Sequence, residues 1–468
     1  MTISRRITPR LLGLAALLGS VSGCTVGPNY AAPKLVAPPA FVEASAAPAL
    51  GPDLAQWWTQ FNDPLLNELI RRALVDNPDL QTSGLRVKQA REQEIITGAA
   101  ELPTLNASSN ALALRTNGGS NSIIPSSLNT SSAGFDASWE PDLFGGTRRA
   151  IEGARADTQA DLWAHRDGQV SLIAEVARDY LTLRALQARI AIDQTELTKQ
   201  RGQFTLISAR RKAGFVTSLD VNQQSQAVSN AIALIPQLEA EAKAQTHAIA
   251  VLLGLAPAAL DATLVPTPAP IVVPPQLPTG LPSELLDRRP DLREAERKLA
   301  SATAQIGVQT ANLYPKINLM ALGAFAGPSV GGLFSSNNLS GIGLGMFTLP
   351  IFNGGKTRAA IREADYGAKA ADLAYQYTFL KALRDVEDAL SQVRADETRR
   401  TALAQAVDAS QHSLKIAQDQ YATGFVTYIN VLQAENAVQA NQDMLIQADA
   451  KNLTDLVALY KALGGGWS

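Results

Sequence analysis

The sequence repeats itself after about 210 residues. The stretch "AGFVTSLDVNQQSQAV" at 213–228 returns as "TGFVTYINVLQAENAV" at 423–438, with the same glycine turn and the same apolar spacing. Three further pairs occur in the same order at nearly the same separation: "NPDLQ" with "RPDLR", "LPTLNASSNALAL" with "YPKINLMALGAFA", and "LFGGTRRAI" with "IFNGGKTRAAI". Recurrence at one period indicates a duplicated structural unit. The chain is therefore predicted to fold as two copies of one architecture.

Each copy is predicted to run helix, strand, loop, strand, very long helix, turn and long helix. Pro78 and Pro290 stand at the favoured first-turn position of a helix in each copy. No proline interrupts 147–212. Apolar residues recur there at steps of seven, as in a coiled coil: Val176, Leu183, Ile190, Leu197 and Phe204. At 1.5 Å per residue, a helix of that length would span roughly 100 Å.

Each copy also contains two short extended segments. Residues 133–141 alternate between apolar and polar side chains, which predicts a strand with one apolar face. Segments 105–115, 317–326 and 341–349 alternate less cleanly. Their length suits the wall of a membrane barrel, but four strands cannot close one, because the smallest such barrels have about eight. Either these strands lie in water, or several chains build one barrel.

The N-terminus is predicted to be an export signal. Three arginines precede the apolar run "LLGLAALLGS", and "VSGC" follows at 21–24. "VSGC" resembles a bacterial lipobox, which predicts cleavage before Cys24 and a covalent lipid on it. Cys24 is the single cysteine of the chain. The alternative is an ordinary signal peptide with an incidental cysteine. Thr25 follows, and by resemblance to lipoprotein sorting this favours the outer membrane.

The predicted organisation follows from these features. A connector at 257–282 holds eight prolines, which excludes the interior of a helix. The remaining boundaries are a lipoprotein signal peptide at 1–23, a lipid-anchored extended segment at 24–60, a first repeat at 61–256 and a second repeat at 283–468.

Several classes of function are disfavoured. The net charge is −2, so there is no basic field to bind nucleic acid. One cysteine allows neither an internal disulfide framework nor a cysteine-cluster metal site. His165, His247 and His412 have no second ligand at helical or hairpin spacing. No motif combines a nucleophile with a base. We therefore expect no enzyme, no metal and no cofactor other than the lipid.

Together these motifs carry a family resemblance. "CTVGPNYAAP" at 24–33, "WWTQFNDPLLNELI" at 57–70, "LRDVEDAL" at 383–390 and the duplicated segments are similar to the TolC/OprM-type outer membrane factors, in their NodT-like lipoprotein branch. The resemblance implies a mainly α fold with a small β part, in which long coiled-coil-like helices form a barrel. It implies a homotrimer whose chains each give four strands to one twelve-stranded transmembrane β-barrel in the outer membrane.

The same resemblance implies a mechanism and partners. The long helices would form a periplasmic tunnel that docks on a periplasmic adaptor protein and an inner-membrane pump. The conduit would be passive, and the pump would supply the energy of multidrug efflux. The resemblance leaves open the exported compound and the identity of both partners.

The resemblance also assigns the two glycine turns to the hairpin tips, where the tunnel narrows to its gate. The turn residues are Gly214, Phe215, Gly424 and Phe425. Glycine there frees the backbone for a tight reversal.

Five residues fall at gate positions of this family. Asp220 and Tyr421 match a tyrosine–aspartate hydrogen bond that holds the closed gate. Ile429, Asn430 and Gln433 stand where relatives place a leucine or acidic ring residues, so the acidic ring is missing here. Its absence argues against strong cation selectivity. The alternative for Asp220 and Tyr421 is ordinary chemistry of a helix end, with the aspartate as a cap and the tyrosine packed.

Two other functions stay open. One is a conduit for protein secretion, which would have the same fold. The other is a non-conducting, lipid-anchored scaffold whose helices only bridge the layers of the envelope. The amphipathic strands argue against a scaffold, because a coiled-coil strut has no use for them.

Overall fold

The computed structural model describes residues 25–43, 54–115, 127–266 and 284–467. The predicted signal peptide, the predicted lipid attachment at Cys24 and residues 267–282 of the predicted connector lie outside the described residues.

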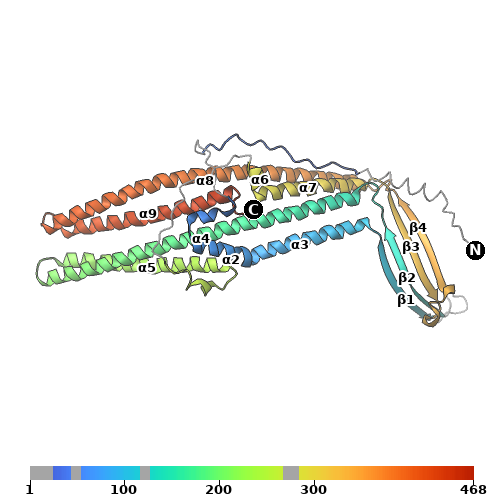
Figure 1. The fold of residues 1–468 in the computed structure, drawn as a ribbon, viewed down its shortest axis with the longest axis horizontal. Helices are drawn as coiled ribbons and strands as arrows, with labels where there is room; N and C mark the ends of the chain where they lie inside the picture. The colour runs from blue at the N-terminus through green and yellow to red at the C-terminus, as the bar shows by residue number, and fades with distance from the viewer. Residues whose placement is uncertain (1–24, 44–53, 116–126, 267–283, 468) are drawn as a thin grey trace, which may run out of the picture. The chain divides into compact units, whose positions relative to one another are not determined.

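The duplication is plain in the order and length of the elements (Figure 1). The first copy contains α2 (Pro64–Asp76), α3 (Pro78–Gly98), β1 (Thr104–Arg115), β2 (Ser127–Trp139), α4 (Gly146–Lys212) and α5 (Ser218–Leu252). The second contains α6 (Leu285–Arg288), α7 (Pro290–Ala311), β3 (Lys316–Gly327), β4 (Leu339–Thr348), α8 (Lys356–Ala422) and α9 (Tyr428–Ala462). Helices α4 and α8 each have 67 residues, and α5 and α9 each have 35. This confirms the predicted fold class, mainly helical with four strands.

The chain divides into two compact units. The first comprises the described parts of residues 1–34, 86–161 and 294–375, and it holds the sheet. The second comprises the described parts of 35–85, 162–293 and 376–468, and it holds most of the two long hairpins.

The sheet of the first unit has the strand order β1-β2-β3-β4, and all three pairs are antiparallel. The register places Phe135, Ala107 and Gly323 side by side on one face. That face is mostly apolar or small in every strand, with Arg115 and Asn129 as exceptions in β1 and β2. The opposite face is polar over the first part of β1 and the part of β2 that pairs with it, where the Asn106 amide donates to the Asp136 carboxylate at 3.0 Å. The less regular alternation predicted for β3 and β4 places Met320, Leu344 and their neighbours on this second face.

The second unit has an apolar core near the C-terminal end of α9. A short 3-10 helix, Leu54–Phe61, brings in Trp57, which is fully buried and stacks on Tyr460 with a centroid distance of 4.8 Å. Asp63 caps α2 by accepting from the backbone amides of Leu65 and Leu66. Its other oxygen accepts from the hydroxyl of Tyr180 at 2.6 Å. One aspartate thus fixes the start of α2 against α4.

The apolar residues that recur every seven positions along α4 are buried or half-buried. Val176 and Leu183 are at most 1% exposed, and Ile190, Leu197 and Phe204 are half-buried. A continuous apolar stripe explains why so long a helix forms, since most helical stability in proteins comes from packing one face.

The second helix of each hairpin ends at a glycine in the left-handed region. Gly254 follows α5 with φ +68°, and Gly464 follows α9 with φ +75°. A Cβ at Gly254 would lie 2.7 Å from the carbonyl oxygen of Asp76, and one at Gly464 would lie 2.7 Å from that of Arg288. Both sites therefore require glycine for two reasons, conformation and space.

We predict that Gly464→Ala destabilises the protein more than Gly424→Ala. Gly424 also has a positive φ, of +78°, but a Cβ there would meet nothing within 4 Å. Its replacement should cost only the left-handed backbone strain, about 1–2 kcal/mol, whereas Gly464→Ala adds the clash with Arg288. Thermal unfolding of the two variants checks this. Equal losses would show that space at Gly464 is unimportant.

Candidate functional site at the helical turns

The same hydrogen-bonded turn ends both long helices. Gly214 and Gly424 have φ of +82° and +78°. The amide of Phe215 donates to the carbonyl of Arg210, and that of Phe425 donates to Gln420, both at 2.9 Å. This is the Schellman arrangement, which satisfies carbonyls that the end of a helix leaves free. Each hairpin therefore reverses tightly and without strain.

The two phenylalanines of the turns point into solvent. Phe215 is 81% exposed and Phe425 is 83% exposed. Both hairpins thus present one large apolar side chain at their ends. In a single chain these rings bury little of their surface.

Asp220 lies in a capping box. Its carboxylate accepts from the Thr217 amide at 2.8 Å and from the Thr217 hydroxyl at 2.7 Å, and the Thr217 hydroxyl accepts from the Asp220 amide at 3.3 Å. Asn430 holds the equivalent place in the second copy, where its amide donates to the Thr427 hydroxyl at 3.0 Å. The spacing T-x-x-D signals such a box in the sequence. Asp220 thus stabilises the start of α5, whereas Asn430 contacts Thr427 without completing a capping box at the start of α9.

Tyr421 has a different partner from the one that the resemblance implies. Its hydroxyl accepts from Nη1 of Arg210 at 3.3 Å, and its ring lies 5.5 Å from that of Tyr428. Among the described residues, the hydrogen bonds of Asp220 go to Thr217 and not to Tyr421. The Asp220–Tyr421 hydrogen bond of the gate therefore stays a prediction.

A hydrophobic cluster joins the ends of the two hairpins. Its buried centre is formed by Ile207 of α4 with Tyr428, Val431 and Leu432 of α9. Side chains from all four long helices or their turns pack around it, including Val216, Val221, Leu414, Tyr421 and Ile429. Of the other predicted gate residues, Gln433 is exposed. The structure thus brings Tyr421 and Ile429 into one cluster and leaves Gln433 outside it.

A buried polar network lies next to this cluster. The Tyr428 hydroxyl is 2.6 Å from Oε1 of Gln224 and 2.9 Å from Oε1 of Gln203. Nε2 of Gln203 donates to Oε1 of Glu435 at 2.5 Å, and Nε2 of Gln224 donates to the carbonyl of Gln200 at 3.0 Å. Sequence reasoning missed these residues. The available sign was the step of seven from Tyr428 to Glu435, which puts both on one face of α9.

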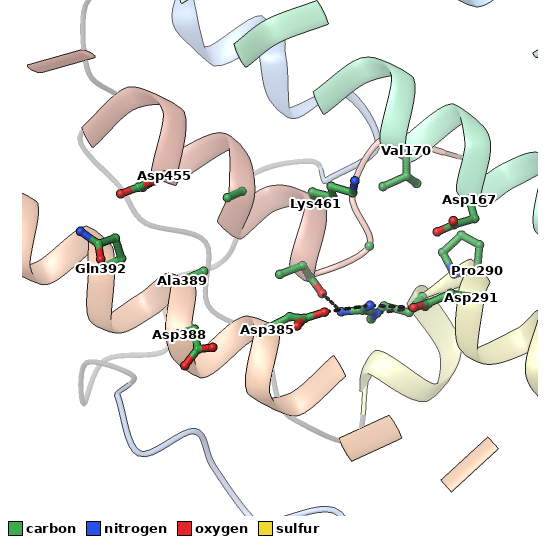
Figure 2. Close-up of a pocket in the computed structure, with 14 residues that line it drawn as sticks. Asp167, Val170, Pro290, Asp291, Asp385, Asp388, Ala389, Gln392, Asp455 and Lys461 are labelled. Atoms are coloured by element: carbon green, nitrogen blue, oxygen red, sulfur yellow. Dashed lines mark hydrogen bonds and ion pairs between the residues drawn. The ribbon is translucent and has the colours of Figure 1, made fainter. Parts of the chain in front are cut away.

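A second candidate site is a pocket of about 430 Å³ near the C-terminal end of α9 (Figure 2). Asp385, Asp388 and Asp455 line it, together with the buried Arg289. The Arg289 guanidinium donates to both oxygens of Asp291, at 3.0 and 2.7 Å, and to the carbonyl of Ala462 at 3.1 Å. These bonds tie the start of α7 to the end of α9.

That pocket is best explained as structural. Arg289 and Lys461 offset part of the acidic lining, and Arg289 is itself held by Asp291 and the carbonyl of Ala462. Among the described residues no group of three or more His, Cys, Asp or Glu side chains could hold a metal ion. Burial, together with the neighbouring Asp396, raises the pKa of Asp455.

Comparison with known proteins identifies the class. A family described as outer membrane efflux protein matches residues 69–255 and 281–465. The pyoverdine export outer membrane protein OpmQ of Pseudomonas aeruginosa is 32% identical over 97% of this chain and 96% of its own. The outer-membrane channel OprN is 33% identical, with a TM-score of 0.87 over 95% of this chain and 100% of that one. The MtrE channel of Neisseria gonorrhoeae, solved in its open state, is 27% identical, with a TM-score of 0.83 over 95% and 99%.

The protein is thus an efflux channel of the outer membrane, as predicted. The chain belongs to the outer membrane efflux protein family. Members of this family are transport proteins. Within the described helices, none is long and apolar enough to cross a membrane.

We predict that Tyr428→Phe destabilises the protein by about 1–3 kcal/mol, because it leaves the buried Oε1 of Gln224 without the donor that lies 2.6 Å away. Tyr421→Phe is the matched control. It removes one 3.3 Å bond at a half-exposed site and should change stability by less than about 0.5 kcal/mol. Urea unfolding followed by circular dichroism measures both. A loss in Tyr421→Phe as large as that in Tyr428→Phe would contradict this ranking.

Proposed function

We propose that three copies of this chain form one passive conduit, which a periplasmic adaptor and an inner-membrane pump open for export. The observation that carries the proposal is the sheet. Among the described residues, β1 and β4 each pair with one strand only, so both edges of the sheet are unpaired. Unpaired edges are costly in lipid. Three sheets joined edge to edge would close a barrel of twelve strands.

The exposed side chains of the sheet support this arrangement. Phe135, Leu105 and Phe347 lie on the apolar face and are at least 60% exposed. The face of Phe135 is apolar or small along most of all four strands, whereas the other face carries Asn106 and Asp136 on β1 and β2 and apolar side chains on β3 and β4. The face of Phe135 is therefore the one suited to lipid. In the proposed barrel, the apolar face would be turned outward.

We further propose that Cys24 carries the covalent lipid. The segment that follows it is firmly held in the first unit. The amide of Val26 donates to the carbonyl of Phe144 at 3.1 Å, and Nη2 of Arg149 donates to Oδ1 of Asn29 at 2.6 Å. A Cβ at Gly27 would lie 2.5 Å from the Cα of Gly307. This tight docking supports an anchor that begins at a fixed place on the protein.

The gate of the conduit is proposed to lie at the hairpin ends. The hydrophobic cluster around Tyr428 holds both hairpins together there, and MtrE shows by its open state that a related channel opens. Asp220, Tyr421, Ile429, Asn430 and Gln433 are the proposed gate residues. The export of a small molecule is supported by the name of OpmQ, a pyoverdine export protein. On this proposal the protein carries out no reaction of its own.

The test is single-channel conductance of the purified protein in a planar bilayer. We expect small, rarely open currents from the wild type. The double variant Asp220→Ala with Tyr421→Phe should open more often, because it removes the capping carboxylate of α5 and the hydroxyl that Arg210 contacts.

Two results would contradict the proposal. No current from folded wild-type and variant protein would favour the non-conducting scaffold. Conductance that is unchanged in the double variant would show that Asp220 and Tyr421 do not hold the gate.

A further inference from the structure

The contacts recorded between α4 and α9 are polar over a long stretch of both helices. Arg189 of α4 binds Asp443 of α9, with Nε and Oδ1 at 2.5 Å. Nε2 of Gln439 then donates to Oδ1 of Asp193 at 3.2 Å, and Gln203 binds Glu435 nearer the turns. Residue numbers rise along α4 as they fall along α9, so the contacts form successive rungs between two antiparallel helices. We call these contacts the polar seam.

Glu435 stands out among the rungs. Glu435 is only 8% exposed. Oε1 accepts from Gln203, but Oε2 is buried and meets no hydrogen-bond partner among the described residues. A buried carboxylate with one unsatisfied oxygen is costly, so this position favours a neutral side chain.

The groups that face Glu435 act in both directions. Burial raises its pKa most, and the Glu196 carboxylate of α4 adds to the rise. The hydrogen bonds from Gln203 and Gln200 and the ammonium of Lys199, all on α4, lower the pKa of Glu435 and so oppose this rise. On α5 the uncharged side chain of Gln224 joins the network through its contact with the Tyr428 hydroxyl. The net effect is a raised pKa for Glu435.

We propose that Glu435 is a positioning residue of the gate, which holds the second hairpin against α4 most firmly when its carboxyl group is protonated. The inference rests on the proposed gated channel and deepens it. Glu435 lies one helical turn after Val431 and Leu432 of the hydrophobic cluster on α9. Tyr428 belongs to both the cluster and the polar network. Separation of α9 from α4 would break the bond to Gln203 and expose the carboxyl group to water.

The sign of the pH effect follows from this geometry. In the closed state the pKa of Glu435 is raised, and in an open, wetted state it returns toward its ordinary value of about 4.3. The closed state therefore binds the proton more tightly. Its extra stability is fully present below about pH 4 and is lost as the pH rises through the raised pKa.

The test is the open probability of single channels between pH 4 and pH 8, for the wild type beside Glu435→Gln. The wild type should open several-fold more often at the alkaline end. Glu435→Gln, a neutral isostere that can still bind Gln203, should stay near the acid-end value throughout. Glu239→Gln is the matched control, because Glu239 is exposed on α5. It should behave as the wild type does.

Two further variants keep the test decisive. Glu435→Ala leaves Gln203 without its partner and should open more often than the wild type at acid pH. Asp193→Asn changes another carboxylate of the polar seam whose pKa burial also raises. It should retain most of the pH response, because Asp193 lies farther from the hydrophobic cluster that joins the hairpin ends.

The outcomes separate this inference from the proposed function. A wild-type channel without a pH response, a response that persists in Glu435→Gln, or a response that disappears only in Asp193→Asn overturns the role of Glu435 and leaves the channel intact. No current at any pH from folded protein overturns the proposed function and this inference together.

Discussion

The fold depends on apolar side chains that recur every seven residues along the long helices, because the packing of this face supplies most of the stability of a helix. Val176 and Leu183 show the effect in α4, where both are almost fully buried. Burial of each such side chain contributes about 1.5–3 kcal/mol. A stripe of this kind lets helices of 67 and 35 residues form, and Gly214 and Gly254 end them. The two turns take their places from the ends of these helices.

Between the hairpins, the hydrophobic cluster lies at the turns, and the contacts of the polar seam are of another kind. Arg189, Gln203 and Tyr428 make bonds across the polar seam that water could replace, so each is worth only about 0.5–1.5 kcal/mol net. Apolar burial has no such substitute. The two hairpins should therefore separate from each other more readily than either comes apart. A channel that opens and closes needs this difference in stability, since each hairpin must stay folded while the distance between the two hairpins changes.

Much of the fold was predictable because its determinants are local. The duplication, the helix starts at Pro78 and Pro290, and the length of α4 all follow from spacing and from proline. Strand β2 begins at Ser127, six residues before the alternating pattern, because "SLNTSS" has no apolar period and is placed only by pairing with β1. The capping box of Asp220 was also visible, as T-x-x-D.

The polar network could not be predicted in the same way. Gln203 and Tyr428 are 225 residues apart, and nothing local marks them as partners. The same holds for Arg210 and Tyr421, whose contact depends on how the two hairpins meet. Family resemblance pointed to Ile429 and Gln433, and the buried residues Tyr428 and Glu435 stand beside these in the sequence. A seven-residue pattern predicts which residues share one face of a helix. Which residue of another helix packs against that face depends on how the hairpins pack together.

The central claim is that the hairpins move as units across the polar seam. The most direct measurement is pulsed electron paramagnetic resonance, in a Cys24→Ser background, between spin labels at Phe215 and Phe425, which are exposed on the two turns. A second pair, at Leu206 and Leu219, reports on the first hairpin alone and is also exposed. The account predicts that Glu435→Ala lengthens or broadens the distances between the hairpins and leaves those within the first hairpin unchanged. Equal changes in both pairs, or no change between the hairpins, would contradict it.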